Sequence, residues 1–173
     1  MIGLENQTLQ SKRLTYRLLE ETDKDALREI LSDKSVTEPG GFLPAGSKEE
    51  FNDFFATLTR YNTGIAILLG ETLLGYIHVN RHRSDLPEYR EKSGVMLGFV
   101  IGKAYQNHGY ATEALETITA YLKQTFDYCA ADHFVGNEPS KRVIEKCGYQ
   151  YVETYTMLFE ALGKEMTCLG YIC

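Results

Sequence analysis

The segment VMLGFVIGKAYQNHGYATEALETITAYL, residues 95–122, joins three local patterns in one stretch of chain. Residues 95–101 form a nearly continuous apolar run, which is typical of a strand that is buried on both faces and therefore central in its sheet. Residues 111–126 place apolar side chains at the spacing of one helix face. The polar loop 102–109 lies between them, so the segment predicts a central strand that turns tightly into a helix.

The loop at 102–109 predicts an anion-binding site. At the start of a helix several backbone N–H groups lack partners, and the helix dipole adds partial positive charge, which suits a phosphate or pyrophosphate. Gly109 and Ala111 leave room for a ligand to approach the backbone closely. A P-loop is excluded because Gly98 and Gly102 are one residue too close and no Ser or Thr follows the lysine. The glycine spacing of a dinucleotide-binding fingerprint is absent as well.

The rest of the chain predicts an order of elements that mixes hairpins with βαβ crossovers. Hydrophobic alternation predicts further strands at 14–18, 65–69, 73–79, 133–135, 149–159 and 166–172. Capping boxes at Thr22–Asp25 and Ser47–Glu50 begin two helices, and a third helix spans 139–147. The second of these carries an aromatic and aliphatic core stripe, Phe51, Phe54, Phe55, Leu58 and Tyr61. Residues 38–44 and 81–93 are predicted to be irregular. The order β-α-α-β-β-β-α-β-α-β-β implies an α/β fold with a mixed sheet and helices on both faces.

Length and charge limit the class of protein. A chain of 173 residues is expected to form a single domain, 1–173. Its 18 Lys and Arg against 24 Asp and Glu give a net charge of −6, which argues against nucleic acid and anionic membranes as partners. The sequence has no apolar stretch of membrane-spanning length and no signal-peptide pattern at its start, so a cytoplasmic location is expected. The four Cys and four His are scattered, which predicts free thiols and no metal site.

Two linked motifs carry a family resemblance. The first is Gln106-x-x-Gly109-x-Ala111 followed by the helix start, and the second is Asn137-x-x-Ser140-x-x-VIEKCGY, which ends at Tyr149. With both motifs, the stretch 94–153 resembles the GCN5-related N-acetyltransferase superfamily, and within it the branch of ribosomal-protein-alanine and spermidine N-acetyltransferases. The resemblance implies a mixed, mostly antiparallel sheet that splays at a coenzyme slot, with about four helices on both faces. It also implies an enzyme that uses acetyl-CoA as co-substrate.

The resemblance assigns coenzyme-binding residues in the loop and on the strands beside it. The pantetheine arm is expected to pair with backbone groups near Phe99, Val100 and Ile101. The pyrophosphate is expected on backbone N–H groups of Asn107, His108, Gly109, Tyr110, Ala111 and Thr112, with Gln106 and His108 side chains either at the phosphates or in water. The side-chain amide of Asn137 is expected to reach the pantetheine, to cap the following helix, or to do both.

Catalytic residues are less well defined by the resemblance. Many relatives carry a Tyr seven residues after the Asn as the acid that protonates the leaving thiolate, whereas this chain has Ile144, so Ser140 is the candidate acid. Relatives often place a Glu near position 96, where this chain has Met96. His78, Glu38 or a chain of waters remain as candidates for the base. Cys147 lies at a core position, which favours direct transfer without a covalent intermediate.

The resulting hypothesis is acetyl transfer from acetyl-CoA to a primary amine, namely a protein N-terminus, a polyamine or a small-molecule amine. The alternative is a non-catalytic acyl-CoA-binding module. The acceptor site is expected among residues 32–46, the hairpin around Tyr76 and His78, and the last hairpin from Tyr155 to Met166. An exposed strand near the C-terminus would also allow a homodimer.

Overall fold

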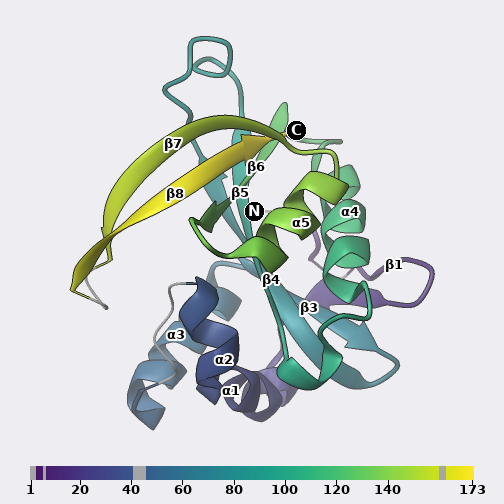
Figure 1. The fold of residues 1–173 in the computed structure, drawn as a ribbon. Coiled ribbons are helices and arrows are strands. Elements are labelled where there is room, and N and C mark those ends of the chain that lie inside the picture. Colours follow the sequence, from purple (N-terminus) through teal and green to yellow (C-terminus); the bar gives the residue numbers. More distant parts are fainter. Residues whose placement is uncertain (1–2, 6, 41–45, 160–162) are drawn as a thin grey trace.

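A computed structural model of the chain describes residues 3–5, 7–40, 46–159 and 163–173. Its centre is one eight-stranded sheet in the order β1-β2-β3-β4-β5-β6-β8-β7 (Figure 1). The strands are β1 Leu9–Gln10, β2 Thr15–Leu18, β3 Gly64–Leu69, β4 Thr72–His82, β5 Gly94–Ile101, β6 Tyr128–Phe134, β7 Gln150–Phe159 and β8 Lys164–Ile172. Every neighbouring pair is antiparallel except β5 and β6, which run parallel because helix α4 connects them as a crossover.

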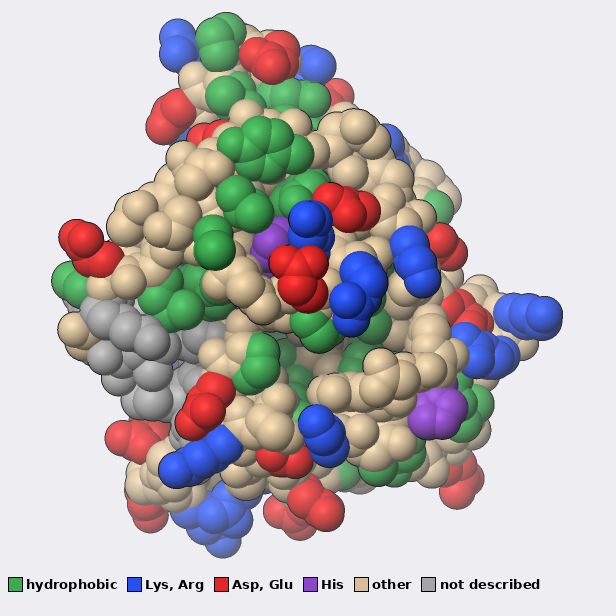
Figure 2. All heavy atoms as spheres, viewed as in Figure 1, with side chains coloured by type: hydrophobic (Ala, Val, Ile, Leu, Met, Phe, Trp, Pro, Cys, Tyr) green, Lys and Arg blue, Asp and Glu red, His purple; other side chains and the backbone are tan. Residues whose placement is uncertain are grey.

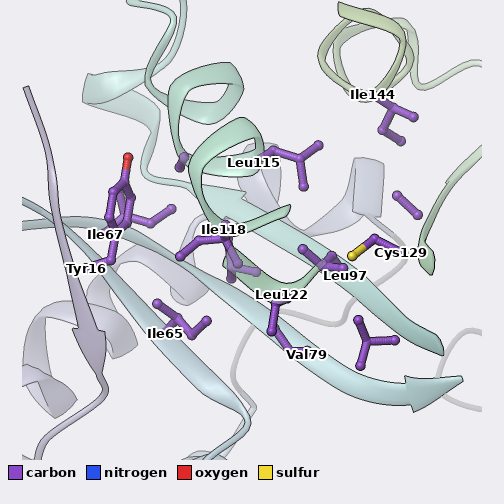
Figure 3. Packing of buried hydrophobic residues seen from close by; sticks show 14 of the residues in the cluster. Tyr16, Ile65, Ile67, Val79, Leu97, Leu115, Ile118, Leu122, Cys129 and Ile144 are labelled. Carbon is purple, nitrogen blue, oxygen red and sulfur yellow. The ribbon is translucent and has the colours of Figure 1, made fainter. Parts of the chain in front are cut away.

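Helices cover both faces of the sheet, as the sequence predicts. Helices α4 (Tyr110–Leu122) and α5 (Glu138–Lys146) lie on one face and α1 (Lys24–Ser32), α2 (Lys34–Thr37) and α3 (Lys48–Arg60) on the other (Figure 1). Leu115, Ile118 and Leu122 of α4 pack between the helix and the strands, where they belong to the largest of the buried clusters (Figure 3). The mixed α/β fold expected from the sequence is confirmed, with α2 as an additional short helix.

The sheet opens between its two central strands. Parallel pairing of β5 with β6 extends only from Gly94↔Tyr128 to Met96↔Ala130, although both strands continue. Beyond this point β5 keeps β4 as its partner, whereas β6 follows β8. Among the described residues, the backbone edge of β5 that faces β6 therefore has no strand partner after Met96. This opening is the splay that the resemblance implied.

Helix termini follow local sequence, with one displaced cap. Helix α3 begins at the predicted box, in which the Glu50 N–H donates to Ser47 Oγ at 3.1 Å and the Ser47 N–H donates to Glu50 Oε2 at 2.8 Å. The box predicted at Thr22–Asp25 is wrong, because the box that forms lies two residues earlier, where the Glu20 N–H donates to Asp23 Oδ2 at 2.8 Å. Arg17 holds the same carboxylate at 2.6 and 2.9 Å, so the chain enters α1 through the 3₁₀ turn η1 (Glu21–Asp23).

Three further expectations differ from the structure. Tyr61 is not in the core but 62% exposed, because α3 ends at Arg60 and Asn62 then takes a positive φ of 51°. The predicted strand 133–135 covers only the end of the longer β6, and Val135 lies in the turn that follows. The first four residues of β6 are all buried, so they lack the alternation that marks a half-buried strand. Strand β5 has buried residues on both faces, as predicted, but Gly98 is exposed where β6 has diverged.

Parts of the expected acceptor region lie outside the described residues, namely 41–45 and 160–162. Within the described part, β7 is an edge strand that pairs with β8 alone and exposes Tyr151, Met157 and Leu158. Pairing of this edge with a second copy stays a prediction.

Candidate active site

The loop that leads into α4 presents a run of unpaired backbone donors. Strand β5 ends at Ile101, the short 3₁₀ turn η3 (Lys103–Tyr105) follows, and α4 begins at Tyr110. Within the described residues, none of the backbone N–H groups from Asn107 to Thr112 donates to a protein acceptor, whereas the N–H of Glu113 donates to the Gly109 carbonyl at 3.1 Å. Six consecutive unpaired N–H groups at a helix start form a site for an anion.

The backbone of this loop needs two left-handed residues. Asn107 has φ 65° and Gly109 has φ 77°. Asn tolerates this region and Gly adopts it freely, which explains both residue types. Alternation of left-handed and ordinary conformations turns successive N–H groups toward one side, as in anion-binding nests. The sequence thus specifies the curvature of the loop as well as its glycine.

Two polar side chains of the loop bind the loop itself. Gln106 Nε2 donates to the Ile101 carbonyl at 3.0 Å, which fixes the loop to the end of β5. His108 Nδ1 lies 2.8 Å from the Gln106 carbonyl, and its ring stacks on Tyr110 with the centroids 5.5 Å apart. The sequence left these side chains either at the phosphates or in water. In this structure both side chains instead contact the backbone of the loop.

Asn137 joins the start of α5 to the segment after α2. Its Oδ1 accepts the Ser140 N–H at 3.3 Å, so the helix-cap role is observed. Its Nδ2 donates at 2.7 Å to the carbonyl of Pro39, which belongs to the 3₁₀ turn η2 (Glu38–Gly40). This bond places exposed Glu38 near the start of α5. The half-buried Ser140 hydroxyl makes no hydrogen bond with any residue in the described ranges.

The surface is hollowed between α5 and the segment that leads into α4, with Lys and Arg side chains on the α5 side of the hollow (Figure 2). The sequence of α5, EPSKRVIEK, contains three cations. The unpaired loop amides and the free edge of β5 belong to one continuous segment, because the loop follows directly after Ile101.

On the face of the sheet away from α4 and α5, residues of adjacent strands form a row beside the opening. His78 on β4 pairs with Gly98 on β5, and directly paired residues of antiparallel strands share a face. Two residues beyond the Met96↔Ala130 pair, Asp132 on β6 is the counterpart of Gly98 across the opening. Asp132 in turn pairs with Gly170 of β8. Two glycines thus flank the carboxylate, and a Cβ added at Gly98 would meet no atom within 4 Å.

The polar groups in this row have distinct electrostatic settings. Burial lowers the pKa of His78, so its imidazole is neutral near pH 7. The Tyr155 hydroxyl on β7 donates a short hydrogen bond to Asp132 Oδ2. Burial, together with this adjacent carboxylate, raises the pKa of Tyr155, which keeps the phenol protonated. The row therefore contains a neutral imidazole and a carboxylate held by a phenol, with open space over Gly98 between them.

Asp132 received no role from the sequence, and neither did Arg13, which lies beside the loop amides. Tyr155 was expected only as the start of the hairpin that borders the acceptor site. Asp132 lies in a strand whose local pattern is unremarkable, and only strand register brings it opposite Gly98. No group of three or more potential metal-ligating side chains occurs in the described part of the chain. The helices of those same residues include none long and apolar enough to cross a membrane.

Comparison with known proteins defines the class. The model of the acetyltransferase (GNAT) domain family matches residues 13–150. An acetyltransferase of the GNAT family from Bacillus anthracis superposes with a TM-score of 0.80 at 20% identity, over 96% of this chain and 98% of that one. No curated protein sequence is significantly similar to the chain.

Two further similar structures were solved with coenzyme. Spermidine N-acetyltransferase from Vibrio cholerae, in complex with CoA and spermine, superposes with a TM-score of 0.76 at 14% identity, covering 94% of this chain and 96% of that one. A protein from Salmonella typhimurium with its cofactor acetyl-CoA gives a TM-score of 0.68 at 14% identity, covering 94% of each chain. The chain belongs to the GNAT acetyltransferase family and is an acyl-CoA-dependent N-acetyltransferase.

Proposed function

We propose that this enzyme transfers an acetyl group from acetyl-CoA to a primary amine by direct attack in a ternary complex. The observation that carries the proposal is the run of six unpaired N–H groups from Asn107 to Thr112, which offers the pyrophosphate several donors at a helix start. The free edge of β5 after Met96 offers its backbone groups to the pantetheine amides, as strand addition does. The similarity to structures solved with CoA and acetyl-CoA supports the same coenzyme here.

Bound acetyl-CoA supplies a thioester, whose carbonyl carbon forms the new bond to the amine nitrogen while the carbon–sulfur bond breaks. His78 accepts the proton that the amine loses, because its lowered pKa leaves the ring unprotonated and it faces the open space at Gly98. The Ser140 hydroxyl, free of other bonds within the described chain, donates a proton to the sulfur. Because a thiol has a pKa of about 8.5, the thiolate is a fair leaving group, and a weak acid such as the Ser140 hydroxyl is sufficient. We favour His78 over Glu38, which lies exposed in η2 near the start of α5.

Asp132 attracts the amine to the opening. A primary amine is a cation in neutral solution, and a carboxylate across the opening from Gly98 stabilises it on approach. Tyr155 fixes the orientation of that carboxylate. Protein N-termini, polyamines and small-molecule amines all fit this description, and the spermine bound by the Vibrio cholerae enzyme supports a polyamine as one member of the test panel.

The test has two stages. Thermal unfolding is measured with acetyl-CoA, with ATP and NAD as controls. At a hundredfold excess over Kd, binding stabilises the fold by about 2.7 kcal/mol, or about 5–10 °C at this size. A shift with acetyl-CoA alone is expected, and no shift contradicts the coenzyme site.

Release of free thiol is then measured with an alanine-terminated peptide, spermidine and a small aliphatic amine. We expect release with at least one of them. A thermal shift without thiol release from any amine would favour the non-catalytic acyl-CoA-binding module.

A further inference from the structure

The turn between β1 and β2 places Arg13 against the loop that precedes α4. Arg13 Nε lies 2.7 Å from Glu113 Oε2, and Nη1 donates to the His108 carbonyl at 3.0 Å. The guanidinium carbon lies 4.5 Å from the centre of the Tyr110 ring. The contacted residues all belong to the loop or the first turn of α4, although Arg13 is 95 residues away from His108 in sequence.

Glu113 holds this arginine in one orientation. Its Oε1 accepts the Ser11 hydroxyl at 2.7 Å and the backbone N–H of Arg13 at 2.8 Å, while Oε2 accepts Arg13 Nε. Partial burial alone would raise the pKa of Glu113, but these hydrogen bonds together lower it, so the carboxylate stays charged. Backbone and side chain of Arg13 are thus bound by the same carboxylate, which limits the freedom of the guanidinium.

One end of the guanidinium stays unused. Arg13 Nη2 makes no hydrogen bond with any residue in the described ranges, although Nε and Nη1 both do. This Nη2 is the atom that a Cβ added at Gly109 would approach, at 3.5 Å. Gly109 belongs to the run of six unpaired N–H groups in the described chain. Two guanidinium protons therefore remain available beside the loop proposed for the pyrophosphate, on a side chain that is 40% exposed.

We propose that Arg13 is a coenzyme-binding residue that donates from Nη2 to the pyrophosphate of acetyl-CoA. The proposal rests on the coenzyme site proposed above. Arginine suits the task because its planar fork can bind a carboxylate with one edge and a phosphate with another, which the single ammonium of lysine does not do. The bond from Nη1 to the His108 carbonyl also keeps that oxygen engaged, so the loop presents donors rather than an acceptor to the anion.

The experiment measures the Kd of CoA and of 3′-dephospho-CoA for the wild type, Arg13→Gln, Arg13→Lys and the control Arg17→Gln. Arg17 lies on the adjoining strand and pairs with Asp23, so its loss lowers stability without touching the loop. We expect Arg13→Gln to raise both Kd values about 10-fold, with Arg13→Lys in between and Arg17→Gln at the wild-type value.

Each other outcome overturns a distinct statement. If the wild type binds CoA and Arg13→Gln binds it equally well, Arg13 serves only the fold and the inference is wrong. If only the affinity for CoA falls and that for 3′-dephospho-CoA does not, Arg13 contacts the 3′-phosphate and the pyrophosphate assignment is wrong. If the wild type binds neither coenzyme, the proposed function itself fails, independently of Arg13.

Discussion

The two sides of the opening between β5 and β6 are built by different means. On the coenzyme side, contiguous backbone from Asn107 to Thr112 supplies the donors, and one loop-helix unit contains them all. On the proposed acceptor side, single side chains from three separate strands lie in one row: His78 from β4, Asp132 from β6 and Tyr155 from β7, of which Tyr155 contacts Asp132. Backbone donors serve any side-chain sequence that can adopt the loop, whereas the acceptor side depends on the identity of each residue.

This difference teaches where tolerance to mutation should lie. Backbone N–H groups lose their capacity to bind only when the loop changes conformation, so the sensitive positions are those with a positive φ. Side chains that exchange protons or carry charge lose their function on isosteric replacement, with no change of conformation. Substitutions of matched size can therefore separate the two sides experimentally.

Replacement of His78 by Gln should give the largest effect. The change keeps the size of the side chain but removes a group that accepts a proton, so we expect kcat/KM for the amine to fall about 100-fold. The Kd of CoA should stay within about twofold. His82→Gln is the matched control, since His82 lies on the same strand and its Nδ1 is 3.1 Å from the Tyr128 hydroxyl.

The pH profile of the same pair of variants sharpens the assignment. Burial lowers the pKa of His78 from its ordinary value of 6.5, so the base stays neutral down to a more acidic pH and is lost only below 6.5. Below that pH the slope of log kcat/KM against pH should increase by one unit for the wild type and for His82→Gln, but not for His78→Gln. Retention of the steep limb in His78→Gln would assign the base to another group.

Replacement of Gly109 by Val tests the backbone side. Gly109 has φ +77°, where a β-branched residue is strained, and its added Cβ would point toward Arg13. Gly70→Val is the matched control, because Gly70 has φ +60° and open space around it in the β3–β4 turn. Both variants should lose stability, but only Gly109→Val should raise the Kd of CoA, by about 30-fold or about 2 kcal/mol. Equal Kd values in the two variants would mean that the loop conformation does not matter for the coenzyme.

The same contrast explains how much the sequence could predict. Helix α4 and the loop before it follow from one continuous segment, because helix periodicity, an apolar run and a glycine are all local signals. The splay of the sheet was expected only from the family resemblance. Local reasoning failed where a distant partner intervened. The capping box forms between Glu20 and Asp23 instead of Thr22 and Asp25, where Arg17 of β2 also binds the Asp23 carboxylate.

On the proposed acceptor side, His78 and the hairpin that starts at Tyr155 were expected from the sequence, but Asp132 had no local signal. Asp132 is one acidic residue in a short strand, and its importance arises from the register that places it opposite Gly98 and beside Gly170. Arg13 was missed for the same reason, since its partners His108 and Glu113 lie about a hundred residues further along the chain. Pairings between distant strands depend on tertiary packing, which hydrophobic patterns do not encode residue by residue.

Replacement of Asp132 by Asn should give the smallest of these effects and tests the acceptor side through charge alone. The amide has nearly the size of the carboxylate and can still accept the Tyr155 hydroxyl, so the fold should be retained. We expect the KM of a cationic amine to rise about 10-fold, equivalent to about 1.4 kcal/mol, with the Kd of CoA unchanged. The exposed Asp127, bound to Ser93 at 2.8 Å at the start of β6, supplies the control Asp127→Asn.

The charge argument predicts where this effect should disappear. Above the pKa of the amine the acceptor is neutral, so the difference in KM between the wild type and Asp132→Asn should shrink toward one. Added salt should reduce it as well, because part of the attraction acts across solvent. A difference that persists with the neutral amine would mean that Asp132 acts by shaping the opening rather than by its charge. A matching loss of CoA affinity would mean that the two sides of the opening are not independent.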